Sequence, residues 1–255
     1  MPVYFAKGGV LTPTGEVELR EEHAWHLARV LRARPGESIR VVVDGTQELL
    51  VELSMVSADL VRGRVLAVEP ARGEPRCRLL LVQAVPKGLG MTEVCERTSE
   101  LGVASIWPVF TERTVPRPGP EARAGRRRRW SKVASEAAQL AGRSRAPLVE
   151  EPEGLAAALE RIRAQEPDTQ LFVCHQEGTA IPLASAPYDP ARPAAILIGP
   201  EGGWSPGELR RLSSRGAATV SLGPRNLRTV MAGVVAVTLL LARAGELGPP
   251  LGDPA

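Results

Sequence analysis

The sequence lacks the features that would place the protein in a membrane or outside the cell. No apolar run in its 255 residues reaches the roughly 20 residues that a membrane-spanning helix needs. The N-terminus shows no charged and then apolar segment of the kind that directs secretion. The three cysteines, Cys77, Cys95 and Cys174, are widely spaced within apolar stretches, which indicates small core residues and neither a disulfide framework nor a zinc site. We therefore expect a cytoplasmic protein with no membrane span and no metal.

The motifs of two common enzyme classes are also missing. The phosphate-binding pattern G-x-x-x-x-G-K-[ST] does not occur. The turn at residues 86–93 supplies two glycines of G-x-G-x-x-G, but Glu93 stands in place of the third. His175 is the only histidine after residue 70, and no serine or cysteine motif accompanies it. The sequence therefore argues against a standard Rossmann site and a hydrolytic triad, and favours group transfer by positioning of the reactants.

Residues 1–70 have the pattern of a small β-barrel. Short β-branched or alternating runs at 17–19, 38–43, 47–53 and 60–68 predict strands, and a helix is expected at 21–31. Asp44-Gly45 between two of the strands predicts a hairpin. Several short strands with one helix indicate a barrel. Residues 72–75 have the composition of a linker, so we predict one domain over residues 1–70 and a second over residues 71–255.

The second domain alternates strands and helices, which predicts an α/β fold with a mostly parallel sheet. Strands are expected at residues 79–85, 105–109, 170–174, 195–198 and 219–222, and helices at 92–101, 126–141, 155–162, 205–215 and 231–242. Ser205 and Glu208 have the order of a capping box, with Pro206 at the first helical position. The last helix is apolar on all sides, and we expect it to pack on a second subunit as well.

Two loops rich in glycine and proline, at residues 199–204 and 223–228, organise this domain. Each follows a short apolar strand and precedes a helix. Such a loop brings the backbone close to a ligand, because glycine has no Cβ and the helix start offers free N–H groups. An ordinary α/β unit with two tight turns would show the same pattern. The polar residues Glu201, Arg225 and Arg228 at the loop tips favour one ligand pocket with two walls.

Basic side chains, nearly all arginine, gather in two segments. The first lies on the predicted helix around Trp130 and consists of Arg123, Arg126, Arg127, Arg128, Arg129 and Lys132. The second lies on and beside the predicted barrel helix and consists of Arg20, His23, His26, Arg29, Arg32 and Arg34. One such run alone is usually a solvated helix face. Two of them, each able to neutralise several phosphates, favour RNA as the partner.

Four stretches carry a resemblance to a known family. They are EHAWHLARVLRARPG at residues 22–36, KGLGMTEVCERTSELGV at 87–103, LIGPEGGWSPGEL at 197–209 and SLGPRNLRTVMA at 221–232. In these residues the chain resembles the SPOUT class of S-adenosylmethionine-dependent RNA methyltransferases, and more closely the family that methylates N3 of a uridine in 16S ribosomal RNA. The resemblance implies a PUA-like barrel, an α/β domain with a C-terminal trefoil knot, a homodimer, and S-adenosyl-L-methionine cupped in the knot loops.

The implied reaction gives each group of candidate residues a role. Loss of the uridine N3 proton leaves an anion that cationic donors would stabilise, so Arg225 and Arg228 are the candidate catalytic residues. The candidate cofactor-binding residues are His175, Ile198, Gly199, Pro200, Glu201, Gly202, Ser221, Leu222, Gly223, Asn226, Leu227, Arg228, Met231 and Ala232. The candidate RNA-binding residues are Arg29, Arg32, Lys87, Arg126, Arg127, Arg128 and Arg129. The implied partner is 16S ribosomal RNA or the small ribosomal subunit.

Two places depart from the family's pattern, and both are expected near the pocket. Thr229 is followed by Val230 and Met231 where the family usually has a glutamate after the threonine. Gln139-Leu140 replaces a Glu-Gln pair near the end of the basic helix. Two alternatives remain open at this point: a catalytically inert RNA-binding ribosome-assembly factor, and a SPOUT methyltransferase that acts on tRNA.

Overall fold

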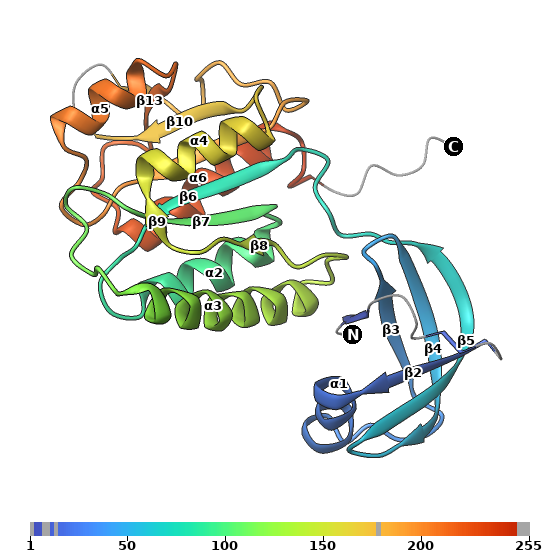
Figure 1. The fold of residues 1–255 in the computed structure, drawn as a ribbon. Helices are drawn as coiled ribbons and strands as arrows, with labels where there is room; N and C mark the ends of the chain where they lie inside the picture. The colour runs from blue at the N-terminus through green and yellow to red at the C-terminus, as the bar shows by residue number, and fades with distance from the viewer. Residues whose placement is uncertain (1–2, 7–10, 13–14, 177–179, 249–255) are drawn as a thin grey trace, which may run out of the picture. The chain divides into compact units, whose positions relative to one another are not determined.

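The computed structural model describes residues 3–6, 11–12, 15–176 and 180–248 (Figure 1). Its contacts divide the chain into two compact units: unit 1 consists of Met1–Glu74 and Ala138–Ala146, and unit 2 of Pro75–Ala137 and Pro147–Ala255. The buried Arg143 guanidinium donates to the Glu74 carboxylate across 2.6 Å, which ties the second segment of unit 1 to the first. The sequence placed a domain boundary after residue 70 and did not anticipate the second segment.

Unit 1 is built on a curved mixed sheet. Its strands, within the described residues, are β1 (Val3–Ala6), β2 (Glu16–Arg20), β3 (Ser38–Val43), β4 (Gln47–Val56) and β5 (Leu60–Pro70), in the order β1-β3-β4-β5-β2. The β1–β3 pair is parallel and the other pairs are antiparallel. Residues 44–46 join β3 to β4, and the turn is closed by the Thr46 N–H, which donates to the Val43 carbonyl across 3.1 Å. Asp44 and Gly45 have φ values of 49° and 67°, the positive values typical of a tight hairpin turn. The predicted hairpin is therefore confirmed, whereas β1 was not predicted.

One helical segment packs on this sheet. Helix α1 (Glu21–Trp25) continues as a π-helical turn, η1 (His26–Val30), and buries Ala24 and Leu27 in the core of unit 1. Figure 1 shows it beside β2. Gly63 in β5 allows β4 to pack closely, because a Cβ there would lie 2.4 Å from the Val51 side chain.

Unit 2 contains a parallel sheet, as the sequence predicted. Its strands in the described part are β6 (Leu79–Ala84), β7 (Ser105–Phe110), β8 (Leu148–Val149), β9 (Glu153–Gly154), β10 (Gln170–Cys174), β11 (Ile181–Pro182), β12 (Ala194–Ile198) and β13 (Ala218–Ser221). Their order is β11-β13-β10-β12-β6-β7-β8, and β9 also pairs with β7. Strand β12 lies between β6 and β10 although both precede it in the sequence.

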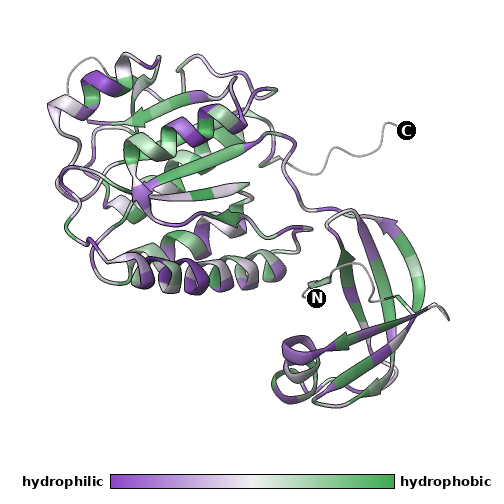
Figure 2. Ribbon diagram, in the orientation of Figure 1, coloured by the Kyte–Doolittle hydropathy of each residue, from purple (hydrophilic) through white to green (hydrophobic). Residues whose placement is uncertain are grey.

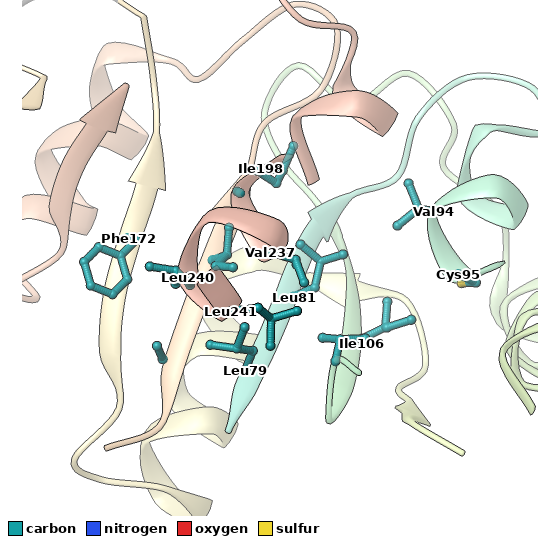
Figure 3. Packing of buried hydrophobic residues seen from close by; sticks show 14 of the residues in the cluster. Leu79, Leu81, Val94, Cys95, Ile106, Phe172, Ile198, Val237, Leu240 and Leu241 are labelled. Carbon is teal, nitrogen blue, oxygen red and sulfur yellow. The ribbon is translucent and has the colours of Figure 1, made fainter. Parts of the chain in front are cut away.

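Helices cover both faces of this sheet. They are α2 (Gly90–Leu101), α3 (Pro120–Leu140), α4 (Leu155–Gln165), α5 (Pro206–Ser213) and α6 (Thr229–Arg243). Leu79 and Leu81 join the core that contains residues of α2, α3 and α6, and Figure 3 shows them around α6 together with Leu240. Leu80 and Val82 point the other way and join the core that contains residues of α4 and α5. Both faces are apolar, which explains why green predominates on the central strands in Figure 2 and confirms the α/β class.

Three helices begin earlier than the sequence predicted. Helix α2 starts at Gly90 and not at residue 92. Helix α3 starts at Pro120 and not at residue 126, because a proline is well suited to the first helical position. Helix α6 starts at Thr229, directly after the second glycine-containing loop. Helix α5 has the predicted capping box: the Ser205 hydroxyl accepts from the Glu208 N–H, and the Glu208 carboxylate accepts from the Ser205 N–H. In the described part, no helix is long and apolar enough to cross a bilayer.

Candidate active site

A cavity of about 650 Å³ lies at the carboxyl ends of β6, β10, β12 and β13. Its walls come from the turn after β6 (Pro86, Lys87 and Gly90), the end of β10 (residues 174–176), residues 198–204, and residues 222, 225–230 and 232. Ligand sites of α/β proteins lie at this end of the sheet, because the loops that follow neighbouring parallel strands meet there. Both loops that the sequence singled out therefore line one cavity.

The first glycine loop (residues 199–204) is held against the sheet by Trp204. The buried Trp204 indole donates from Nε1 to the Cys174 carbonyl across 3.1 Å, which joins the loop to the end of β10. A Cβ at Gly199 would lie 3.1 Å from that indole nitrogen, so only glycine lets the backbone pass here without displacing Trp204. The loop then turns at Gly203, whose φ is 68°, and α5 begins behind it.

The second glycine loop (residues 223–228) is joined to the first through Thr229. The Thr229 hydroxyl donates to the Gly199 carbonyl across 2.7 Å. It also accepts from Nε2 of Gln83, a fully buried side chain of β6, across 2.9 Å. The Gln83 Oε1 atom has no hydrogen-bond partner in the described structure. Burial of an unpaired acceptor is costly, so the Gln83–Thr229–Gly199 chain holds three walls of the cavity together at some expense in stability.

The charged side chains that line the cavity are Lys87, Glu201, Arg225 and Arg228. The Glu201 carboxylate accepts from the Lys87 backbone N–H across 2.9 Å, so it fastens the first glycine loop to the turn after β6. Arg225 and Arg228 are exposed, and within the described residues neither guanidinium has a carboxylate partner. Both remain available to a ligand that carries or develops negative charge.

The remaining titratable groups of the cavity do not form a nucleophile. Burial raises the pKa of the Cys174 thiol to about 12, so the thiol stays protonated at neutral pH. His175 lines the cavity beside it, and its backbone N–H donates to the Val220 carbonyl across 2.9 Å. Among the described residues, no group of three or more His, Cys, Asp and Glu side chains is placed to hold a metal ion.

The structure brings most of the candidate residues together. The predicted residues that line the cavity are His175, Ile198, Gly199, Pro200, Glu201, Gly202, Leu222, Arg225, Asn226, Leu227, Arg228 and Ala232, and Lys87 joins them. Ser221, Gly223 and Met231 do not line it. The Ser221 hydroxyl instead accepts from the Gly223 N–H across 3.1 Å and shapes the second glycine loop, while the Met231 side chain is 51% exposed on α6.

The sequence did not predict every residue that lines the cavity. Of the residues that depart from the family's pattern, only one lines it. The sequence did not name Pro86, Gly90, Cys174 or Gln176 for the pocket, although it placed His175 and the loop that contains Trp204 there. Of the departing residues, Val230 lines the cavity, whereas Met231, Gln139 and Leu140 do not. The Gln139-Leu140 pair lies at the C-terminal end of α3, and its expected proximity to the pocket stays a prediction.

The predicted RNA-binding residues lie outside the cavity except for Lys87. Arg29 and Arg32 are exposed at the end of η1. On α3, Arg127 and its two successors are exposed, while Arg126 is half-buried. Arg127 also has a structural contact, because its Nε donates to the Val149 carbonyl across 3.1 Å. Trp130 within this run points inward and belongs to the core.

The chain is similar to known methyltransferases in sequence and in structure. A family model for the RNA methyltransferase domain matches residues 73–241. Ribosomal RNA small subunit methyltransferase E of Synechocystis is 30% identical over 230 residues, which cover 89% of this chain and 73% of that protein. The crystal structure of the protein of the same name from Neisseria gonorrhoeae, bound to S-adenosyl methionine, is 25% identical with a TM-score of 0.84 and covers 95% of this chain and 98% of that one. A Legionella pneumophila methyltransferase structure in complex with the same cofactor is 29% identical, with the same TM-score and the same coverage of both chains.

These similarities, together with the cavity between the glycine loops, identify the class and the family of the protein. The match over residues 73–241 places it in the class of RNA methyltransferases. More specifically, the chain belongs to the ribosomal RNA small subunit methyltransferase E family. The resemblance inferred from the sequence is thereby confirmed, and the protein is an enzyme.

Proposed function

We propose that this protein transfers a methyl group from S-adenosyl-L-methionine to N3 of a uridine in 16S ribosomal RNA of the small subunit. The observation that carries the proposal is the cavity of about 650 Å³ in which two glycine loops face each other beside the unpaired guanidinium groups of Arg225 and Arg228. Such a site offers backbone hydrogen-bonding groups to a small-molecule methyl donor and positive charge to the RNA that accepts the methyl group. We expect the reaction to take place in the cytoplasm, where ribosomal RNA is found.

The residues present fit S-adenosyl-L-methionine. The cavity volume falls within the range of about 300–1,000 Å³ that is usual for sites of small molecules. Gly199 and Gly202 expose bare backbone along one wall, and residues 225–228 form the other. When bound, the cofactor supplies a methyl group on a sulfonium sulfur. The two glycine loops would hold and orient it, and the Thr229–Gly199 hydrogen bond keeps those loops at a fixed separation.

The chemistry of the uridine that accepts the methyl group indicates the role of Arg225 and Arg228. Uridine N3 carries a weakly acidic proton, which must leave before or during formation of the N–CH3 bond. The negative charge that remains spreads onto the two carbonyl oxygens of the base. Guanidinium groups of Arg225 and Arg228 aimed at those oxygens would stabilise the charge as it develops, and a preorganised donor of this kind is worth most in a site that excludes water.

The finer fold assignments also belong to this proposal. The curved mixed sheet of unit 1 with its single helix is consistent with a PUA-like barrel. Insertion of β12 between two earlier strands, and the contact of Thr229 with Gly199, are consistent with a trefoil knot in which the second loop meets the first. Helix α6 keeps Met231 exposed and leaves Val234, Val235 and Leu239 half-buried, an apolar surface that supports a homodimer.

The direct test uses ribosomal subunits from a strain in which the gene has been deleted. Purified protein and labelled S-adenosyl-L-methionine are added to free 16S ribosomal RNA, to 30S subunits and to tRNA, and modified nucleotides are mapped by mass spectrometry. Label on N3 of one uridine in 16S ribosomal RNA is the expected result. Label on tRNA would assign a different substrate, and binding of RNA and cofactor without any transfer would identify an inert assembly factor.

A further inference from the structure

The helical segment of unit 1 presents apolar side chains to solvent. Trp25 is 54% exposed, and Val30 and Leu31 are 52% and 47% exposed. The other three tryptophans of the sequence, Trp107, Trp130 and Trp204, are at most 5% exposed. Exposed apolar side chains that lie together mark a binding surface, because soluble proteins rarely leave a contiguous apolar patch in water. We name the set Trp25, Arg29, Val30, Leu31 and Arg32 the barrel-helix surface.

The segment that carries this surface is fixed in place from its other side. Ala24 and Leu27 are fully buried in the core of unit 1. The His23 ring contacts the Phe5 carbonyl through Nε2 at 2.9 Å, and the His26 ring contacts the Tyr4 hydroxyl through Nδ1 at 3.2 Å. Both histidines thus hold the helix against β1. The barrel-helix surface is therefore rigid before any partner arrives, which lowers the entropic cost of binding.

The π-helical turn sets which side chains share the outer face. The Leu31 N–H donates to the His26 carbonyl across 3.0 Å, five residues back, as a π turn requires. In such a turn, residues four or five positions apart lie above one another, so Arg29 and Val30 follow Trp25 along one face. Arg32 ends the segment with a φ of 54°, a backbone conformation unusual for arginine.

The charges of the segment are divided between its two ends. Glu21 and Glu22 stand in the first turn of α1, where negative charge is favoured. Arg29 and Arg32 stand at the other end and are exposed, and in the described part of the chain neither has a carboxylate partner. An exposed indole face next to two free guanidinium groups fits an unpaired nucleotide, because the base stacks on the ring and the flanking phosphates pair with the cations.

We propose that Trp25 is a stacking platform for an unpaired base of the RNA substrate, with Arg29 and Arg32 on the flanking phosphates. The proposal rests on the proposed function in that the same ribosomal RNA is the ligand, and it assigns unit 1 the recognition of a single-stranded segment.

The test uses the fluorescence of the exposed tryptophan. A single-stranded oligonucleotide from 16S ribosomal RNA should quench the emission of the full-length protein, and a duplex of the same sequence should quench it much less. Trp25→Phe should remove the quenching but keep most of the RNA affinity. Trp25→Ala should weaken RNA binding about five- to 150-fold, the equivalent of about 1–3 kcal/mol for one stacked base. Arg29→Ala should lower the salt slope of binding by roughly 0.7.

Controls separate this proposal from the proposed function. Cofactor affinity should be unchanged in Trp25→Ala, because Trp25 does not line the cavity. If the wild-type enzyme methylates RNA but RNA does not quench its fluorescence, and the variants bind RNA as tightly as the wild type, the stacking proposal alone is overturned. Quenching that depends on Trp25 without any methyl transfer would sustain the stacking proposal and overturn the function. Dissociation of a dimer in Trp25→Ala, seen by light scattering, would show that a second subunit covers the surface and would also overturn the stacking proposal.

Discussion

The Thr229 hydroxyl and the Gly199 carbonyl form a 2.7 Å hydrogen bond that joins the two glycine loops across 30 residues of sequence. This bond fixes the width of the cavity at the point where both loops leave the sheet. It depends on a single threonine hydroxyl, so one substitution removes it.

Replacement of Thr229 by valine keeps the shape of the side chain and removes the hydroxyl. The Gly199 carbonyl would lose this partner and Gln83 Nε2 would keep only its bond to the Ala84 carbonyl, so we expect a loss of about 1–3 kcal/mol in unfolding free energy. The loops would also be held less well for the cofactor, and its affinity should fall about tenfold for each 1.4 kcal/mol of binding free energy that is lost. Urea denaturation and calorimetry measure the two effects. Thr229→Ser keeps the hydroxyl, and a serine variant as weak as the valine variant would contradict this account.

Arg228→Ala tests the charge that develops on the base. If its guanidinium acts in the transition state, kcat and kcat/KM should fall together by about 100- to 1000-fold while RNA affinity holds. Arg225→Ala should act similarly if both arginines share the role. Single-turnover transfer of labelled methyl groups is the measurement. An increase in KM with unchanged kcat would instead assign Arg228 to ordinary substrate binding.

Arg127 and Arg128 are adjacent on α3 but should respond differently to alanine substitution. Arg127→Ala removes the 3.1 Å bond to the Val149 carbonyl and should cost about 1 kcal/mol of stability. Arg128→Ala should leave stability unchanged and lower the salt slope of RNA binding by roughly 0.7, the effect of one lost phosphate contact. Thermal melting and binding at several salt concentrations distinguish the two. Equal behaviour of both variants would mean that the Val149 contact does not matter.

Gly199 and Gly202 form a matched pair in the first glycine loop. A Cβ at residue 199 would press on the Trp204 indole at 3.1 Å, whereas one at residue 202 would meet the Arg113 side chain at an ordinary 3.4 Å. Gly199→Ala should therefore lower stability by about 1–3 kcal/mol through overpacking, and Gly202→Ala by less than about 0.5 kcal/mol. Differential scanning calorimetry compares them. A larger loss in Gly202→Ala would show that the loop is packed differently.

The Cys174 thiol offers a pH-dependent probe of the cavity. Burial disfavours the thiolate and raises the pKa to about 12, and the half-buried residue lines the cavity, from which a small reagent would approach it. Because the thiolate is the reacting form, the alkylation rate should keep rising about tenfold per pH unit above 9 and not level off near 8.5. Mass spectrometry of iodoacetamide-treated protein follows the reaction. Bound cofactor product should slow it, and a plateau near pH 9 would contradict the raised pKa.

Local signals in the sequence predicted more of the site than of its surroundings. The capping box at Ser205 and the turn at Asp44 were readable because each depends on a few adjacent residues. Strand β1 was missed because four residues are too few for a periodic pattern, and its partner β3 lies far along the chain. The contributions of Trp204 and Gln83 to the cavity depend on which strands become neighbours. The order of the strands is a property of the whole sheet and cannot be recognised in any short stretch of the sequence.

Strand β12 has a consequence for how the protein is made. It is the middle strand between β6 and β10, yet the ribosome synthesises it after both. Until residue 198 has emerged, β6 and β10 each expose an apolar edge with unpaired backbone groups, and these edges have no native partner in each other. We therefore expect unit 2 to complete its sheet only near the end of translation, and chains truncated before residue 194 to aggregate.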